Sequence, residues 1–323
     1  MSISSESFLQ PDPVLAALNE AAGEIRKEGP SRWSFAVGPE ETIEVTASVD
    51  QEWVVMDTPL AACEGAQWLQ PKRVWNLLHA NATVTGGAKF AVAGNPRAIR
   101  LRAEIPLRDE IDLQGRIRDA CVGFQEALRC FRCRKSGLSV DGPEPSHSAN
   151  PGPSDTRLQA LCAEAGWASS GRPDGGVAVS LEVPDGYYQA ILRTHDRGLL
   201  SVWVELVSEG SSWPQDSWKA LGVFLLQACG HLKTVRAAAR HLDSGATTAG
   251  LQVVLDPSAG SEELGRAFSA LSVACNLIGK EVKILREEVV GKEYLAMVRG
   301  WSSRSGQSNT KQAPSGEKQR GKR

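Results

Sequence analysis

The sequence predicts an α+β fold built from two repeated modules, each an antiparallel sheet covered by helices in the order α-β-β-β-α-β-β-α. Three observations support this. A proline-rich polar stretch divides the chain near its middle, the same order of helix-like and strand-like segments occurs on either side, and the closing helices share one spacing of apolar residues. With 323 residues, 41% of them hydrophobic, the chain is long enough for two domains with separate cores.

Composition sets the expected boundaries of these modules. Residues 136–155 contain four prolines and almost no large apolar side chain, which is typical of a flexible linker. Residues 302–323 are polar and carry six basic residues against Glu317, as expected of a disordered basic tail. We therefore expect a first module over residues 1–135 and a second over residues 156–301.

The first module is expected to open with a helix over residues 12–27, because Pro13 suits a first helical turn and apolar residues recur at helical spacing. Strands are predicted over residues 33–37, 42–48 and 51–58, followed by a helix over 71–80. Strands over 89–93 and 98–105 and a long closing helix complete the module. Ile43, Val45 and Ala47 alternate with polar residues, which places one face of that strand on a core.

The second module repeats this order. Its first helix begins at Asp155, and its strands are predicted over residues 176–183, 187–194 and 199–207, with a helix over 217–232 and strands over 235–241 and 247–255. Short connections between the first three strands of each half predict antiparallel pairing.

The closing helices supply the strongest sign of a duplication. Six apolar positions repeat at a distance of 151 residues: Leu113, Ile117, Ala120, Phe124, Ala127 and Phe131 correspond to Leu264, Phe268, Leu271, Cys275, Ile278 and Val282. The alternation in the preceding strands is one position out of step between the halves. An insertion or a bulge is therefore expected there.

Four segments carry a resemblance to a known family. They are residues 77–81 (LLHAN), the strand around Phe90, residues 99–107 (IRLRAEIPL) and residues 158–167 (LQALCAEAGW). These segments and the element order resemble type III secretion chaperones of the Tir-chaperone (CesT) class and the YbjN-like proteins, once in each half. The resemblance implies a non-catalytic protein that holds an extended segment of a client, with the two copies forming a covalent pseudo-dimer. The near-neutral charge, the length and the basic tail depart from the pattern of such chaperones.

No pattern in the sequence indicates an active site. Cys130 and Cys133 form a lone C-x-x-C without the second ligand pair of a tetrahedral zinc site, so incidental thiols are favoured over metal or redox use. The five histidines are scattered, and the glycine-rich stretches at 85–87 and 174–176 lack the lysine and helix start of a phosphate site. We predict no enzyme, no cofactor and no metal, while an enzyme whose residues converge only in the folded chain stays an alternative.

Two tryptophans mark a candidate partner-binding surface. Leu200, Val202 and Val204 share one face of their strand, which leaves Trp203 on the other. Trp53, 150 positions earlier, is expected to hold a similar place beside Val55. If helices cover one face of each sheet, these residues lie on the uncovered face, where they pack between the modules, bind a partner or are partly exposed. The predicted site residues are therefore Trp53, Val55 and Trp203.

The predicted function is protein binding, with a client or partner protein held by strand addition and apolar contact. The alternative is a regulatory or scaffold protein whose C-terminal tail makes a weak nucleic-acid contact. The 36 basic and 38 acidic residues nearly cancel, so nucleic acid is not expected to bind anywhere else.

A cytoplasmic location is also expected. The sequence has no signal-like start and no run of about 18 apolar residues that could cross a membrane. Most of its seven cysteines occur singly among apolar residues, as is typical of reduced thiols. The oligomeric state stays open.

Overall fold

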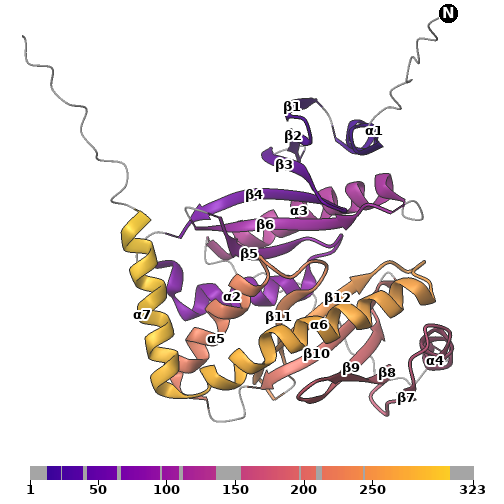
Figure 1. Ribbon diagram of the computed structural model, residues 1–323, viewed down its shortest axis with the longest axis vertical. Coiled ribbons are helices and arrows are strands. Elements are labelled where there is room, and N and C mark those ends of the chain that lie inside the picture. The colour runs from indigo at the N-terminus through magenta and orange to yellow at the C-terminus, as the bar shows by residue number, and fades with distance from the viewer. Residues whose placement is uncertain are drawn as a thin grey trace, which may run out of the picture.

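The molecule contains two six-stranded antiparallel sheets, each packed with helices, and this confirms the predicted α+β class with two repeated modules. Figure 1 shows the two sheets one above the other with α2 and α5 beside each other between them. The computed structural model describes residues 13–22, 24–38, 42–63, 67–94, 97–108, 112–135, 154–195, 198–208, 213–242 and 244–305.

The first module contributes the sheet with strand order β1-β2-β3-β4-β6-β5. Its elements are α1 (Pro13–Ala21), β1 (Ile25–Gly29), β2 (Arg32–Val37), β3 (Ile43–Asp50), β4 (Trp53–Ala62), the short 3-10 helix η1 (Gln67–Leu69), α2 (Pro71–Thr83), β5 (Lys89–Ala93), β6 (Ala98–Pro106) and α3 (Leu113–Lys135). The buried face of α3 includes Ile117 and Phe124, both fully shielded from solvent.

The second module contributes the sheet with strand order β11-β12-β10-β9-β8-β7. Its elements are α4 (Ser154–Glu164), β7 (Ser169–Gly171), β8 (Val177–Val183), β9 (Gly186–Thr194), β10 (Leu200–Ser208), α5 (Gln215–Ala228), β11 (Arg236–His241), β12 (Thr247–Leu255), α6 (Ser261–Leu285) and α7 (Glu288–Ser305). Helix α6 covers this sheet with the fully buried Phe268 and Leu271.

Strand registers show which positions of the two modules correspond. Phe90 pairs with Leu101 in the first sheet and Ala237 pairs with Leu251 in the second, so β6 repeats as β12 at a distance of 150 residues. Bulges after Pro59 in β4 and after Glu205 in β10 occupy the same place. The buried positions of α3 and α6 repeat at 151, so one residue is inserted between strand and helix, as the shifted alternation predicted.

Each module has one strand more than predicted, and this strand comes directly after the first helix of the module. The helix expected over residues 12–27 ends at Ala21, and Ile25–Gly29 forms the edge strand β1. The helical spacing that extends to Ile25 is therefore coincidental, because Gly23, a poor helix former, lies between the two elements. In the second module the additional strand is β7.

The predicted boundary between the second module and the tail is displaced. Helix α7 runs to Ser305, beyond residue 301, and lies along α5 in Figure 1. Its Tyr294 hydroxyl donates a hydrogen bond to Gln227 of α5 at 2.6 Å, and Val298 is fully buried. The remainder of the predicted tail, residues 306–323, and residues 136–153 of the predicted linker lie outside the described residues.

The modules join through α2 and α5. The indole rings of Trp75 and Trp218 stack with centroids 4.2 Å apart, and Gly222 permits the close approach because a Cβ there would lie 2.8 Å from Val74 Cγ1. Helix α2 also packs on β11 of the other sheet, while α5 packs on β5. Through this reciprocal packing the two halves of the chain form one interface. Within the described residues, no helix has both the length and the apolar character needed to cross a membrane.

Candidate functional site

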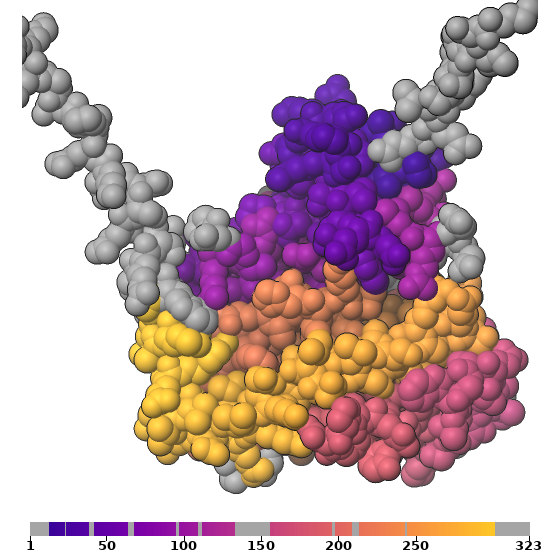
Figure 2. Space-filling model, in the orientation of Figure 1, coloured from indigo at the N-terminus to yellow at the C-terminus, as the bar shows by residue number. Residues whose placement is uncertain are grey.

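A groove with a volume of about 1090 Å³ lies between the two modules. From the first module its lining comes from the start of β4, the end of β6, the loop after α2 and the start of α3. From the second module it comes from residues 231–235, the end of β12 and the first two-thirds of α6. Figure 2 shows α6 crossing the front of the molecule below the first module. Neither module alone contains this site.

One wall of the groove is apolar and exposed. Val273 and Leu277 lie one helical turn apart on α6 and keep 58% and 59% of their surface accessible, whereas their neighbour Ala274 is buried. From the first module, Trp53, Ile105 and Pro106 also line the groove. Two adjacent exposed aliphatic side chains on a concave surface give this wall an apolar area that a ligand could cover.

One end of the groove is lined by charged residues, and ion pairs connect the two modules there. Arg116 of α3 forms ion pairs with Asp256 and Glu263 of the second module. Burial and the nearby Asp256 raise the pKa of the Asp119 carboxyl above its usual value, although Arg116 opposes this shift. The arginine thus links the two walls while the acidic residues keep this end of the groove negative.

The loop before β11 forms the floor of the groove and holds a strained residue. Thr234 has a φ of 60°, in the left-handed region that β-branched residues avoid, and the corresponding Gly87 of the first module has a φ of 71°. Next to it, the Lys233 ammonium lies 5.3 Å from the centre of the Trp53 ring and 3.3 Å from Asp50. The strained turn therefore places a cation against the first module.

A buried polar network fixes the two modules behind the groove. Lys89 of β5 forms an ion pair with Glu104 at 2.9 Å and donates hydrogen bonds to the carbonyls of Leu232 and Val235 in the other module. Its ammonium is almost completely shielded from solvent. Because every donor of a buried lysine needs an acceptor, these contacts fix the loop that forms the groove floor.

A basic side chain of the second module makes the equivalent contact with the first module. Arg236 of β11 donates to the carbonyls of Val84 and Ala88 in the first module. Asn81 of α2 joins the edge strands: its side chain exchanges hydrogen bonds with the backbone of Phe90 and donates to the carbonyl of Ala237 at 2.9 Å. The interface thus supplies partners to backbone groups of both edge strands, at Phe90 of β5 and at Ala237 of β11.

The three predicted site residues do not form one surface. Trp53 lines the groove, whereas Val55 and Trp203 do not line it and are buried, with 7% and 4% of their surface exposed. The strand registers match Trp203 with Asp57 and not with Trp53, so the proposed similarity between the two tryptophans is displaced by four positions. Trp53 makes an inter-module contact, while Trp203 packs against Arg240 and Gly250 of its own module.

Sequence reasoning missed Val273, Leu277 and Lys233. A signal for the first two was present, because both are apolar but fall outside the six-position stripe that defines the buried face of α6. Lys233 carried no signal, since its role depends on the backbone turn at Thr234 and on contact with a residue 180 positions away.

The cysteines and histidines do not gather at the groove. Five of the six described free cysteines are buried and Cys130 is half-buried, while the side chain of Cys133 lies outside what the structure describes. The rings of His79 and His241 stack across the interface at 4.0 Å. Among the described residues, no group of three or more histidine, cysteine, aspartate or glutamate side chains is arranged to hold a metal ion.

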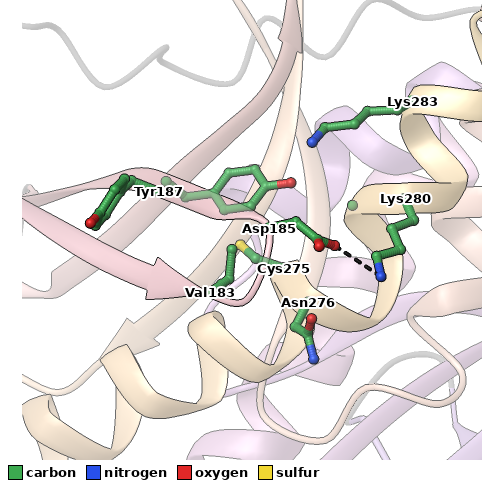
Figure 3. A pocket seen from close by; sticks show the side chains of 9 residues that line it. Val183, Asp185, Tyr187, Cys275, Asn276, Lys280 and Lys283 are labelled. Atoms are coloured by element: carbon green, nitrogen blue, oxygen red, sulfur yellow. Dashed lines mark ion pairs between the residues drawn. The ribbon is translucent and has the colours of Figure 1, made fainter.

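A second pocket lies between the β8–β9 hairpin and α6 (Figure 3). Asp185 of the hairpin forms an ion pair with Lys280 of the helix at 2.9 Å, and Gly279 allows the Tyr188 hydroxyl to approach the helix backbone. Its volume is about 130 Å³, which is small for an organic ligand. The groove between the modules is therefore the stronger candidate.

Comparison with known proteins adds no assignment: no protein-family model matches the sequence, and no curated protein is significantly similar to it.

Proposed function

We propose that the protein binds a segment of a partner polypeptide in the groove between its modules and catalyses no reaction there. The observation that carries this proposal is the exposure of Val273 and Leu277 on one wall of a groove whose lining also includes Trp53. The proposal agrees with the client-holding role that the resemblance to secretion chaperones implies. It places the contact in the groove between the two copies.

The size of the groove favours a polypeptide over a small metabolite. Small-molecule sites usually enclose about 300–1,000 Å³ and shield most of the ligand. This groove, of about 1090 Å³, exceeds that range. A chain segment with two or three apolar side chains fits such a volume, and it would replace the water that covers Val273 and Leu277.

Side chains, and not sheet edges, are expected to make the contact. The strands that reach the groove, β4, β6 and β12, each have a hydrogen-bonded neighbour on both sides. Their backbone groups are therefore already paired and cannot accept an added strand. Strand addition, one mode expected from the sequence, is not favoured in the groove, whereas apolar contact is.

The test uses the full chain and a peptide chosen from a random display library by selection on the wild-type protein. Binding of the fluorescein-labelled peptide is followed by anisotropy. Leu277→Glu places a charge on the apolar wall and should weaken binding roughly tenfold or more. Ile284→Glu is the matched control, because Ile284 is also an exposed residue of α6, at 51%, but does not line the groove.

The proposal fails if both glutamate variants bind the peptide as tightly as the wild-type protein, or if both weaken binding equally. Thermal unfolding of each variant shows that a loss of binding does not come from a loss of fold. An apolar dye such as bis-ANS offers an independent readout, since its fluorescence should fall for Leu277→Glu and stay unchanged for Ile284→Glu.

A further inference from the structure

A tryptophan and an arginine stack on the second sheet, away from the groove. The guanidinium carbon of Arg240 on β11 lies 4.2 Å from the centre of the Trp203 ring on β10. The ring rests over Gly250, where a Cβ would lie 2.7 Å from it. At the positions of the first module that correspond to Trp203 and Gly250, Asp57 and Arg100 form an ion pair. The second module has thus exchanged an ion pair for an aromatic ring that supports a cation.

On the described part of this face of the second sheet, the positive charge of the arginines is not fully balanced by carboxylates. Arg240 has no carboxylate within ion-pair distance among the described residues. The same holds for Arg236, whose Nη2 is also buried without an acceptor. Arg193 is the exception because it pairs with Asp174. Glu205 shares the face but is exposed and forms no ion pair with Arg240. Burial and the neighbouring arginines lower the pKa of both Arg236 and Arg240.

A second unpartnered group lies beside Arg240. Thr248 is directly opposite Arg240 in the pairing of β11 with β12, so both side chains are on one face of the sheet. The Thr248 hydroxyl oxygen is buried and has no hydrogen-bond partner among the described residues. A buried hydroxyl without a partner destabilises a fold, and such a group calls for an explanation. A bound acceptor would satisfy it together with the arginine.

We propose that Arg240 and Thr248, supported by the Trp203 ring, form a binding site for a carboxylate of an acidic polypeptide segment, separate from the groove. A guanidinium positioned over an aromatic ring keeps its N–H groups for bidentate hydrogen bonding to a planar carboxylate. Nucleic acid would need an extended basic surface, but here Asp174 neutralises Arg193 and Arg236 is buried. Arg240, which is half-buried and has no carboxylate within ion-pair distance among the described residues, suits one acidic side chain.

The test measures the affinity of the full chain for two fluorescein-labelled peptides. In one peptide glutamate alternates with valine, and in the other glutamine alternates with valine. The glutamate peptide should bind at least tenfold more tightly, and added salt should weaken it. Arg240→Gln should lower its affinity about tenfold, with Arg240→Lys intermediate because lysine keeps the charge but not the planar fork. Lys292→Gln, which removes the same charge from the exposed side of α7, should change nothing.

Thr248→Val separates a binding role from a structural one. Removing an unpartnered buried hydroxyl should leave the melting temperature unchanged or raise it, while the affinity for the glutamate peptide falls several-fold. If Arg240→Gln does not fold, Thr248→Val alone tests whether the site binds a carboxylate. Equal binding of the two peptides, equal affinity of wild type and both variants, or tighter binding of single-stranded DNA of the same charge would overturn the proposal. Competition by inorganic phosphate as strong as that by acetate would likewise exclude selection for carboxylates.

Discussion

Lys89 and Arg236 reach across one interface in opposite directions, and each ends on backbone carbonyls of the other module. Each is the first residue of an edge strand, and each contacts the loop that precedes the partner's strand. Both are buried, so these contacts are made where water cannot replace them. The two residues therefore set the distance between the sheets, and with it the width of the groove.

Lys89→Met should lower the free energy of unfolding by about 3 kcal/mol, because Glu104 is then buried without its main partner. Arg102 stays within ion-pair distance of Glu104 and limits the loss. Urea denaturation measures the change, and the double variant Lys89→Met/Glu104→Gln should recover part of it. The control Lys292→Met breaks an exposed ion pair that water and salt screen, and it should leave the free energy of unfolding nearly unchanged. A similar small cost for Lys89→Met would show that the network is not a structural element.

Thr234→Gly should stabilise the protein by roughly 0.5–1 kcal/mol. The left-handed backbone at Thr234 costs about 1–2 kcal/mol, of which the greater freedom of glycine in the unfolded chain offsets a part. Chemical denaturation gives the difference directly. The reverse change at the corresponding position, Gly87→Thr, should destabilise by a comparable amount, since a Cβ there meets no atom within 4 Å and only the backbone conformation opposes it. If neither variant shifts the midpoint, the turn is not strained.

Gly222→Ala should destabilise the crossing of α2 and α5. A Cβ at this position would lie 2.8 Å from Val74 Cγ1 and 3.2 Å from the Trp75 ring, so the helices must move apart. Overpacking of this kind costs about 1–3 kcal/mol. Gly265→Ala is the matched control: its nearest contact is 3.6 Å away, so helix propensity alone should stabilise it by up to about 1 kcal/mol. Thermal unfolding of the pair should give shifts of opposite sign.

Stability should fall above pH 9, partly because of buried thiols. Burial raises the pKa of Cys63 and Cys275 to about 12 and that of Cys121 to about 11. In the unfolded chain these thiols ionise from about pH 9, so the contribution is fully present below that value and is lost as the pH rises toward 12. Urea melts from pH 7 to above pH 10 measure the slope. Cys275→Ala should show a shallower decline than the wild-type protein, and an equal slope would contradict the expectation.

The extent to which the fold follows from the sequence differs between elements. Strands β5 and β12 agree with the prediction at both ends, because each is a short, mostly apolar run with glycine, proline or a charged residue close to its ends. Strand β1 was missed because its Ile25 continues a helical spacing by chance. Helix α7 was not predicted as a separate helix. Only its last residues, 302–305, fall in the segment expected to be a polar tail, and the helix is held by contacts with α5 such as Tyr294 to Gln227.

The site was less predictable than the fold. Trp53 was identified from a supposed correspondence with Trp203 at a distance of 150 residues; the strand registers match Trp203 with Asp57 instead, yet Trp53 does line the groove. Lys233, Val273 and Leu277 are distant from it in sequence and line the same groove because the two modules pack together where α2 and α5 cross. No local periodicity encodes that crossing. The stack of Arg240 on Trp203 was equally hidden, since it depends on the absence of a side chain at Gly250 on a third strand.

The covalent pairing of the halves has a thermodynamic consequence. Two modules in one polypeptide face each other at an effective concentration of the order of millimolar, a level that free subunits seldom reach. Dilution therefore does not separate them, and a cleft shared by both persists at whatever abundance the cell maintains. Within the part of the chain that the structure describes, only the second copy carries an additional helix, α7, so the two halves differ and each can evolve toward its own ligand chemistry.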